Sequence, residues 1–322
     1  MKSVFFFKKK SVKLLELFPQ NKILHNFKVE NVKALHVASK NDLTFFDKSN
    51  YALEASNTKA GACITTENLK KHVNKNSAVI VVKNVLYELA KALNKIYTNA
   101  DIDYPDLSLK KPSINKFKSV KFGNNVLIGK NVKIGKNSII GSNSIIEHDV
   151  VIGKDCVIGS GNIIKNSILG DKVVVQDNCK IGLKGFGFIP LKNKNLKFPH
   201  IGRVLISNDV EIGSGCTIDR GSIDDTCIGL NSYLDNQVHI AHNVQIGDNC
   251  MIAGQVGFAG SSSIGNNVSI GGQAGVSGHL NIGNNVKIGG GSGVVKDIKD
   301  NQIVMGYPAV PLKDFIKKNK NE

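Results

Sequence analysis

The sequence predicts a mainly β protein in which a parallel β-helix follows a small α/β domain. Three observations predict the β-helix: aliphatic or aromatic residues recur every six positions over most of residues 106–305, a second small or β-branched residue stands two positions before each of them, and Gly often follows the key residue. Residues i and i−2 of a strand face the same side. Each hexad therefore predicts one short strand and a bend, and successive coils bury their aliphatic residues against one another.

The composition agrees with this architecture. The 322-residue chain contains no Trp, 6% aromatic residues and 32 Gly, which is little material for a conventional globular core. Many thin, regular layers suit such a composition. A flexible Gly-rich linker would not keep twelve successive key positions in phase, as residues 228–294 do.

Residues 1–105 show no hexads and predict the α/β domain. Apolar residues at helical spacing occur in 11–18 and 84–97, whereas 61–67 and 77–83 have the composition of short strands. A stretch that contains Lys and Pro then connects this domain to the coils.

The hexads of residues 106–305 fall into four blocks. Their key positions run from Phe122 to Ile164, from Leu169 to Ile181, from Ile206 to Ile218 and from Ile228 to Val294. Residues 182–204 break the phase and predict a loop that leaves the β-helix, and such loops on rigid scaffolds commonly build binding sites. Residues 306–322 predict a short basic C-terminal helix.

The formal net charge of +16 comes almost entirely from Lys that is spread along the chain without interleaved aromatic residues. We therefore expect no nucleic-acid partner, although a basic surface can favour an acidic protein or an anionic membrane face. Only Arg203 and Arg220 are arginines. A Lys-rich chain that uses Arg twice indicates a need for the planar guanidinium at those positions.

The cysteines and the N-terminus indicate a cytoplasmic protein. The six cysteines show no metal-ligand spacing, and four of them fall at inward positions of the repeat: Cys156, Cys179, Cys216 and Cys250. Buried free thiols suit a reducing compartment. The N-terminal sequence has no cleavage-site pattern, and no stretch is apolar over 18 residues, so we expect neither a signal peptide nor a membrane span.

His242 and Gly260 are the candidate catalytic pair. Each stands two positions after a key residue, so both face outward near a corner, and they are 18 residues, or one coil, apart. Neighbouring coils lie roughly 4.8 Å apart. Acyl transfer requires a base that removes the proton of the nucleophile and an N–H that stabilises the tetrahedral oxyanion. The absence of a Cβ at Gly260 lets a carbonyl group come close to its N–H.

Two other interpretations of the histidines stay open. A His on a repeat face can be a solvated side chain. A metal site is the second alternative, but His242 and His279 are 37 residues apart. That is about two coils, or on the order of 10 Å, so only a subunit interface could bring them to one zinc ion.

Four segments, 186–204, 217–229, 234–265 and 271–280, carry a specific resemblance. They read FGFIPLKNKNLKFPHIGRV, TIDRGSIDDTCIG, LDNQVHIAHNVQIGDNCMIAGQVGFAGSSSIG and GGQAGVSGHL. The repeat resembles that of the hexapeptide-repeat acyltransferases, and these segments resemble the UDP-3-O-acylglucosamine N-acyltransferases of lipid A biosynthesis. The resemblance implies left-handed, three-sided coils and a homotrimer with sites between subunits.

The resemblance also implies the reaction. Enzymes of this family move a (3R)-3-hydroxyacyl chain from acyl carrier protein to the 2-amino group of UDP-3-O-acylglucosamine, without metal or organic cofactor. By resemblance His242 is the general base, Gly260 supplies the oxyanion amide, and His279 is a second histidine of the active site. Asp235 is a candidate for orienting His242 or binding the amino sugar. His239 is a bystander or a substrate contact.

The α/β domain resembles the family's uridine-binding domain. Phe45 and Tyr51 match a Phe-x2-Asn-x2-Tyr pattern whose aromatic residues stack on uracil, but Lys48 stands at the Asn position. Nearby Asn50 is a candidate replacement. The alternative is that the aromatic residues close the core of a small domain.

Three rival functions follow from the same residues. The UDP-GlcNAc O-acyltransferase of the same pathway resembles this chain at the sequence HIAH, but it begins directly with repeats. A zinc-dependent hexapeptide-repeat carbonic anhydrase would contain stoichiometric metal, and its two ligand histidines stand five residues apart rather than three. A purely structural or binding β-helix would not depend on His242 for any activity.

Overall fold

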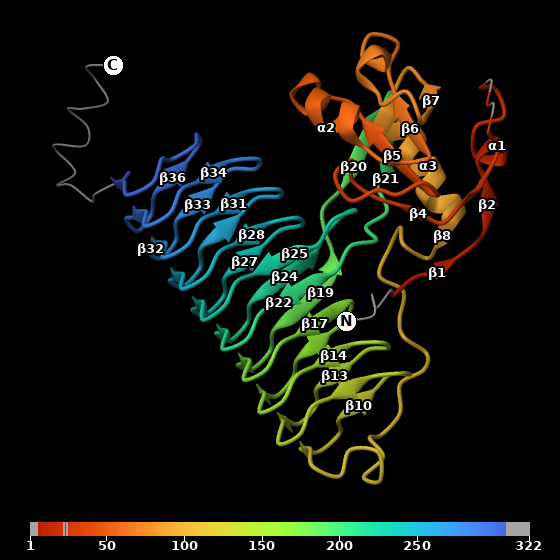
Figure 1. Cartoon of the computed structure of the whole chain (residues 1–322). Coiled ribbons are helices and arrows are strands. Elements are labelled where there is room, and N and C mark those ends of the chain that lie inside the picture. The colour runs from red at the N-terminus through yellow and green to blue at the C-terminus, as the bar shows by residue number, and fades with distance from the viewer. Residues whose placement is uncertain (1–5, 22, 24, 307–322) are drawn as a thin grey trace, which may run out of the picture.

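The protein is mainly β, and three parallel sheets form a left-handed parallel β-helix (Figure 1). The computed structural model describes residues 6–21, 23 and 25–306. The C-terminal helix predicted for 306–322 lies outside the described residues, apart from Gly306. Figure 1 shows the chain descending from the N-terminal domain to the lower end of the β-helix, from where the coils climb to the opposite end.

Each coil contributes one short strand to each sheet. The first sheet contains β10 (Leu127–Ile128), β13 (Ile145–Ile146), β16 (Ile163–Ile164), β19 (Lys180–Lys184), β24 (Thr217–Arg220), β27 (His239–Ile240), β30 (Gly257–Phe258), β33 (Gly275–Val276) and β36 (Gly293–Val294). The second contains β11 (Lys133–Ile134), β14 (Val151–Ile152), β17 (Ser167–Leu169), β22 (Val204–Ile206), β25 (Thr226–Ile228), β28 (Gln245–Ile246), β31 (Ser263–Ile264) and β34 (Asn281–Ile282). The third contains β9 (Lys121–Phe122), β12 (Ile139–Ile140), β15 (Val157–Ile158), β18 (Val174–Val175), β23 (Glu211–Ile212), β26 (Tyr233–Leu234), β29 (Met251–Ile252), β32 (Ser269–Ile270), β35 (Lys287–Ile288) and β37 (Ile303–Val304).

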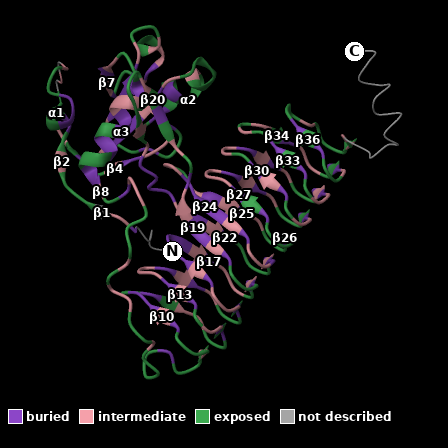
Figure 2. Cartoon of the chain, turned by 180° about the vertical axis from the view of Figure 1, so that it is seen from behind, coloured by how far each residue is buried: buried purple, intermediate pink, exposed green. Residues whose placement is uncertain are grey.

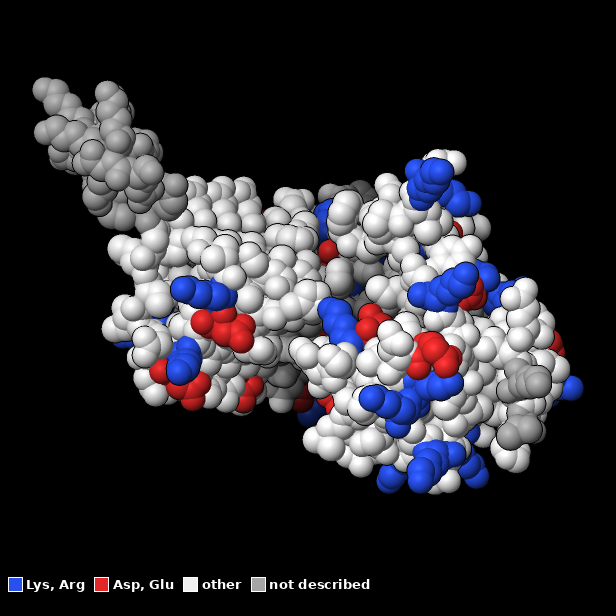
Figure 3. All heavy atoms as spheres, turned by 90° about the horizontal axis from the view of Figure 1, so that it is seen from above, with Lys and Arg blue, Asp and Glu red and all other residues white. Residues whose placement is uncertain are grey.

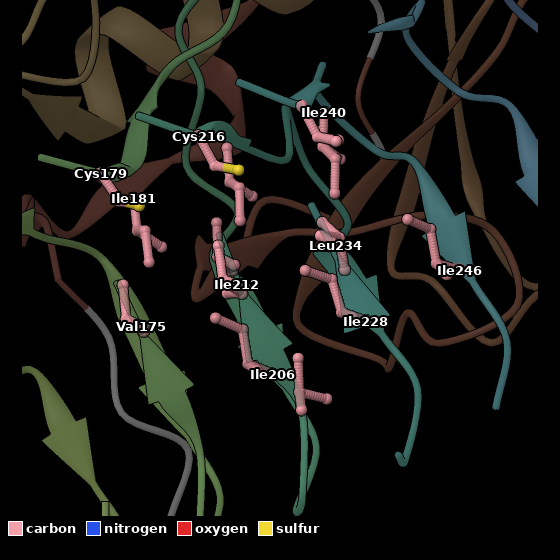
Figure 4. Close-up of a cluster of buried hydrophobic side chains, with 14 of the residues drawn as sticks. Val175, Cys179, Ile181, Ile206, Ile212, Cys216, Ile228, Leu234, Ile240 and Ile246 are labelled. Carbon is pink, nitrogen blue, oxygen red and sulfur yellow. The ribbon is translucent and has the colours of Figure 1, made fainter. Parts of the chain in front are cut away.

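The key positions of the hexads form the core, as the sequence predicts. Ile181, Ile218 and Ile240 are fully buried, and Figure 4 shows side chains of successive coils meeting in the interior. The four cysteines predicted to face inward are also buried, and Cys179 donates to the carbonyl of Gly213 at 3.0 Å. Figure 2 shows that exposed residues gather in the bends, whereas most two-residue strands of the β-helix pair one buried residue with one that is intermediate or exposed.

In the bends, Asn mainly adopts the positive φ angle, whereas Gly allows neighbouring coils to pack closely. The positive φ falls mainly on Asn or Asp, as at Asn131 (φ 60°) and Asn137 (φ 61°), and these residue types tolerate that conformation best after Gly. The Gly that directly follows many key positions serves close packing instead. A Cβ on Gly135 would lie 2.4 Å from the carbonyl carbon of Gly153 in the next coil.

The N-terminal domain holds a four-stranded parallel sheet, with β4 (Asn31–Val32), β5 (Asp42–Phe46), β6 (Ala62–Thr65) and β7 (Ala78–Val81) in that order. Its helices are α1 (Leu14–Leu17), α2 (Ala52–Asn57) and α3 (Val85–Ile96), with 3-10 turns η1 (Ser49–Tyr51) and η2 (Lys70–His72). Two antiparallel pairs complete it, β1 (Lys8–Lys9) with β8 (Tyr97–Thr98) and β2 (Val12–Lys13) with β3 (Lys28–Val29).

α3 illustrates why these residues fold locally as they do. Asn84 caps the helix by accepting from the N–H of Tyr87 at 3.0 Å, and Leu89, Leu93 and Ile96 are buried on one face. The predicted helix over 84–97 and the predicted strands over 61–67 and 77–83 are thereby confirmed as α3, β6 and β7.

The interruption of the repeat is a β-hairpin, β20 (Phe188–Leu191) with β21 (Lys194–Lys197), which lies beside the N-terminal domain in Figure 1. The chain leaves the β-helix after residue 184, whereas the sequence predicts a departure at residue 182. β19 stays paired with β24 as far as Lys184, because a bulge at Gly182 (φ 85°) absorbs the extra residue. Ile201, between β21 and β22, is buried in the core of the N-terminal domain.

Candidate active site

His242 and Gly260 lie in one column on the outer surface of the first sheet. The strands before them, β27 and β30, pair in register, with His239 opposite Gly257 and Ile240 opposite Phe258. The turns continue this stacking, because Ser261 donates to the carbonyl of His242 at 2.9 Å and His279 donates to the carbonyl of Gly260 at 3.1 Å. The constant length of the coil therefore brings together two residues that are 18 positions apart.

The imidazole of His242 lies directly over Gly260. A Cβ on Gly260 would stand 2.6 Å from Cε1 and 2.8 Å from Nε2 of His242, which is closer than any real side chain approaches. No other residue type leaves room for the ring in this position. The sequence prediction that His242 and Gly260 share one patch of the outer surface is confirmed.

The N–H of Gly260 is uncommitted among the described residues. At another corner of the coils, two residues after key positions of the second sheet, the outward N–H is capped by a side chain of the next coil, as Asp248 caps Leu230 at 2.7 Å and Asn266 caps Asp248 at 2.8 Å. The next coil after Gly260 presents Gly278 at this position, which has no side chain to offer. A free, fixed N–H beside an imidazole is suited to stabilise an oxyanion.

Asn243 fixes the tautomer of His242. Its Oδ1 lies 3.0 Å from His242 Nδ1 and accepts from Ser222 Oγ at 2.8 Å, while its Nδ2 donates to the carbonyl of Asp224 at 3.0 Å. Since an amide oxygen only accepts, His242 Nδ1 carries the hydrogen and Nε2 keeps its lone pair. The nitrogen next to Gly260 is therefore the basic one.

The surroundings keep His242 neutral. Burial lowers the pKa of its imidazole below the ordinary 6.5, the hydrogen bond to Asn243 opposes this, and nearby His279 and Lys184 lower it further. A base with a lowered pKa is unprotonated at neutral pH, so activity that depends on it falls only as the pH drops through that lowered value.

The end of β19 and the loop that follows it add residues that the sequence did not single out. His200 is buried, and its ring packs edge-to-face on His242 with centroids 5.0 Å apart. Lys184 places its ammonium 5.5 Å from the ring centre of Phe188 and hydrogen-bonds the carbonyl of Gly185 at 3.2 Å. The closely spaced Gly185 and Gly187 were the available signal, since both approach a histidine ring.

Both arginines use the planar guanidinium as predicted. Arg203 binds Asp225 through two nitrogens, with Nε at 3.0 Å from Oδ1 and Nη2 at 2.6 Å from Oδ2. Arg220 is fully buried, donates through Nη1 to Asp103 and through Nε to the carbonyl of His200 at 3.0 Å. Arg220 thus joins the end of the N-terminal domain to the residue behind His242.

Among the described residues, the other residues predicted for the site make no hydrogen bond with the imidazole of His242, whose partner is Asn243. Asp235 is at the preceding corner, where its carboxylate accepts from the N–H of Asn236 at 2.7 Å. His239 is exposed on the face of the first sheet, and its Nδ1 lies 2.7 Å from the hydroxyl of Thr217. His279 is exposed one coil above Gly260 (φ 61°), close enough to influence the pKa of His242.

The candidate uridine site lies on the N-terminal domain. Phe45 is half-buried in β5, and Tyr51, at the end of η1, is 45% exposed. Lys48 and Asn50 are both exposed in the same turn. The exposure of Tyr51 fits a stacking surface better than a core residue.

Two absences concern the described residues alone. Among them, no three side chains of His, Cys, Asp or Glu come together in a way that could hold a metal ion. None of the helices in this part of the chain is long and apolar enough to cross a bilayer.

The hexad coils place the chain in the class of the hexapeptide-repeat transferases. The model of the bacterial transferase hexapeptide matches residues 119–154, 131–166 and 227–260. The model of UDP-3-O-(3-hydroxymyristoyl) glucosamine N-acyltransferase matches residues 26–95, in the N-terminal domain.

One relative shows to which family the chain belongs. The UDP-3-O-acylglucosamine N-acyltransferase of Rickettsia prowazekii is 45% identical over 307 residues, which covers 94% of this chain and 88% of the relative. The chain belongs to the UDP-3-O-acylglucosamine N-acyltransferase family. The enzyme of the same name from Rhodopseudomonas palustris (strain TIE-1) is 42% identical over 231 residues, which covers 68% of this chain and 63% of the relative.

Two solved structures are also similar. The UDP-N-acetylglucosamine O-acyltransferase of Moraxella catarrhalis is 29% identical, covers 62% of this chain and 76% of its own, and has a TM-score of 0.39. The UDP-N-acetylglucosamine acyltransferase of Campylobacter jejuni is 24% identical, covers 55% of this chain and 68% of its own, and has a TM-score of 0.49.

Proposed function

We propose that the protein transfers a (3R)-3-hydroxyacyl chain from acyl carrier protein to the 2-amino group of UDP-3-O-acylglucosamine. The observation that carries the proposal is the stacking of the basic Nε2 of His242 against Gly260, whose N–H is uncommitted among the described residues. The family membership of the chain supports the choice of substrates.

The chemistry follows from these two groups. The amine attacks the carbonyl carbon of the thioester, so a C–N bond forms and the negative charge on oxygen is stabilised by the Gly260 N–H. His242 Nε2 takes the proton that the amine loses. The oxyanion then collapses, the C–S bond breaks, and the proton on His242 passes to the departing thiolate. No metal or organic cofactor enters these steps.

The remaining residues receive roles around this centre. His279 lines the substrate cleft, and Phe45 and Tyr51 hold the uracil between them, with Lys48 or Asn50 at the polar edge of the base. Asp235 is assigned to the amino sugar and His239 to a substrate contact, because their side chains hydrogen-bond Asn236 and Thr217 rather than His242. The proposed assembly is a homotrimer in the cytoplasm.

The charge distribution supports an acidic carrier protein as the donor. The chain carries a formal net charge of +16, and Figure 3 shows Lys and Arg over the face in view, with smaller groups of Asp and Glu between them. Such a surface raises the rate of encounter with an acidic partner and makes it sensitive to salt.

A transfer assay with two acceptors tests the proposal. Purified protein receives 3-hydroxyacyl carrier protein together with UDP-3-O-acylglucosamine or UDP-GlcNAc, and mass spectrometry identifies the product. We expect an amide on the first acceptor and no product on the second. An ester formed on UDP-GlcNAc would assign the O-acyltransferase reaction instead, and no product with either acceptor would refute acyl transfer to these sugars.

A further inference from the structure

His200 lies behind the proposed base and is almost completely enclosed. Its side chain is 1% exposed, and its ring meets that of His242 at an angle of 68° with centroids 5.0 Å apart. His242 therefore has Gly260 on one side and an aromatic neighbour on another. Two rings that meet edge-to-face attract one another and resist rotation.

The loop is shaped to admit the His200 ring. A Cβ on Gly187 would lie 2.5 Å from His200 Nε2, and a Cβ on Gly185 would lie 2.8 Å from His200 Cε1 and 2.7 Å from His242 Cβ. A side chain at Gly187 would displace the ring of His200, and one at Gly185 would press on both histidines. The close approach of this segment to both rings thus depends on two residues without side chains.

The backbone of His200 is fixed from both sides. Its N–H donates to the carbonyl of Ala100 at 3.1 Å, and its carbonyl accepts from Nε of Arg220 at 3.0 Å. Arg220 is fully buried and also binds Asp103. The segment that ends the N-terminal domain therefore holds His200 in place against the β-helix.

His200 stays neutral near neutral pH, because its pKa is strongly lowered. Burial, followed by the charges of Lys184, His242 and Arg220, lowers its pKa to about 2. Its Nδ1 has no hydrogen-bond partner among the described residues, and burying a polar atom without a partner destabilises the fold. The ring contact with His242 offers a functional reason for a placement that costs stability.

We propose that His200 is a positioning residue for acyl transfer: its ring packs against His242, holds that imidazole over Gly260 and keeps water from its rear side. The inference rests on the proposed function for its kinetic consequences. The charged and titratable groups that face His242 are His279 and Lys184, and Asn243 is its hydrogen-bond partner. His200 adds an uncharged ring that packs against the imidazole.

The variant His200→Gln removes the ring and keeps a polar side chain. We expect kcat to fall roughly 10- to 100-fold, because a misplacement of about 1 Å has this cost, while KM for both substrates stays within about threefold. The acid limb of the pH profile of kcat/KM should move to higher pH. Without the ring, water reaches His242, and the reduced burial lets the pKa of its imidazole rise. An unchanged kcat, an unmoved acid limb or a loss confined to KM would overturn the proposal.

His200→Phe keeps a ring of similar shape and tests whether packing is sufficient. We expect a rate within about tenfold of the wild type and an unmoved acid limb, since the ring contact remains. A folded Phe variant as slow as the Gln variant would contradict the proposal, and this variant carries the test if the Gln variant does not fold. His148→Gln is the matched control, because that ring lies by Phe6 (centroids 6.5 Å apart) and far along the coils from His242.

An NMR titration of His242 in protein labelled at histidine carbons separates this inference from the proposed function. The His242 pKa should rise in His200→Gln and stay unchanged in His148→Gln, whether or not any acceptor is acylated. If the wild type acylates no amino sugar but the pKa rises, the function fails and the packing role stands. If the wild type acylates normally and the pKa does not move, the packing role is wrong.

Discussion

Replacing Gly260 with Ala tests how closely the proposed oxyanion amide and the base are held together. The backbone of Gly260 is not in the left-handed region, so the imidazole of His242 is the main obstacle to a methyl group. The new Cβ would stand 2.6 Å from His242 Cε1, whereas ordinary contacts between carbon atoms begin near 3.5 Å. The ring must therefore retreat by roughly 1 Å, and a displacement of this size lowers kcat about 100-fold.

The assay is steady-state N-acylation, with circular dichroism and size-exclusion chromatography to verify folding and assembly. Overpacking should also lower the free energy of unfolding by about 1–3 kcal/mol. Gly257→Ala is the matched control, because a Cβ there meets no atom within 4 Å in the same coil or its neighbours. A Gly260→Ala variant that is folded and retains more than about a third of the wild-type kcat would refute the close packing of His242 on Gly260.

Three further predictions concern the surroundings of the site. In Lys184→Met the pKa of His242 loses one positive neighbour that lowers it, so the acid limb of kcat/KM should move to higher pH in a pH-rate profile; an acid limb at lower pH would contradict the electrostatic role. Arg220→Met leaves the carboxylate of Asp103 without its buried partner, so urea unfolding should show a loss of about 3–5 kcal/mol, and a loss below about 1 kcal/mol would mean that the pair is not structural. Tyr51→Ala should raise KM for the sugar nucleotide roughly tenfold with little change in kcat, since a stacking contact is worth about 0.5–1.5 kcal/mol beyond the area it buries; an unchanged KM would remove Tyr51 from the uridine site.

The hexad period predicts most of the β-helix and half of the site because a coil of constant length converts sequence spacing into position. His242 and Gly260 are 18 residues apart, so the period alone places them in one column. The left hand of the coils could not be worked out from the period and came from the resemblance to hexapeptide-repeat acyltransferases.

The period gives no information where it is broken. His200 lies in the loop between β19 and β22, and its position depends on the hairpin folding back onto the N-terminal domain. Long-range hydrogen bonds with Ala100 and Arg220 fix it there, and these have no signature in the local sequence. Asn243, in contrast, directly follows His242 and could have been considered as its partner.

The most direct test of the account is single-turnover N-acylation by His242→Ala that retains the assembly of the wild type. With enzyme in excess over 3-hydroxyacyl carrier protein and saturating UDP-3-O-acylglucosamine, the rate of amide formation isolates the acyl-transfer step. The account predicts a loss of at least about 100-fold, because removal of a general base costs roughly 10²–10⁴-fold. A rate within about threefold of the wild type would show that His242 is not the base.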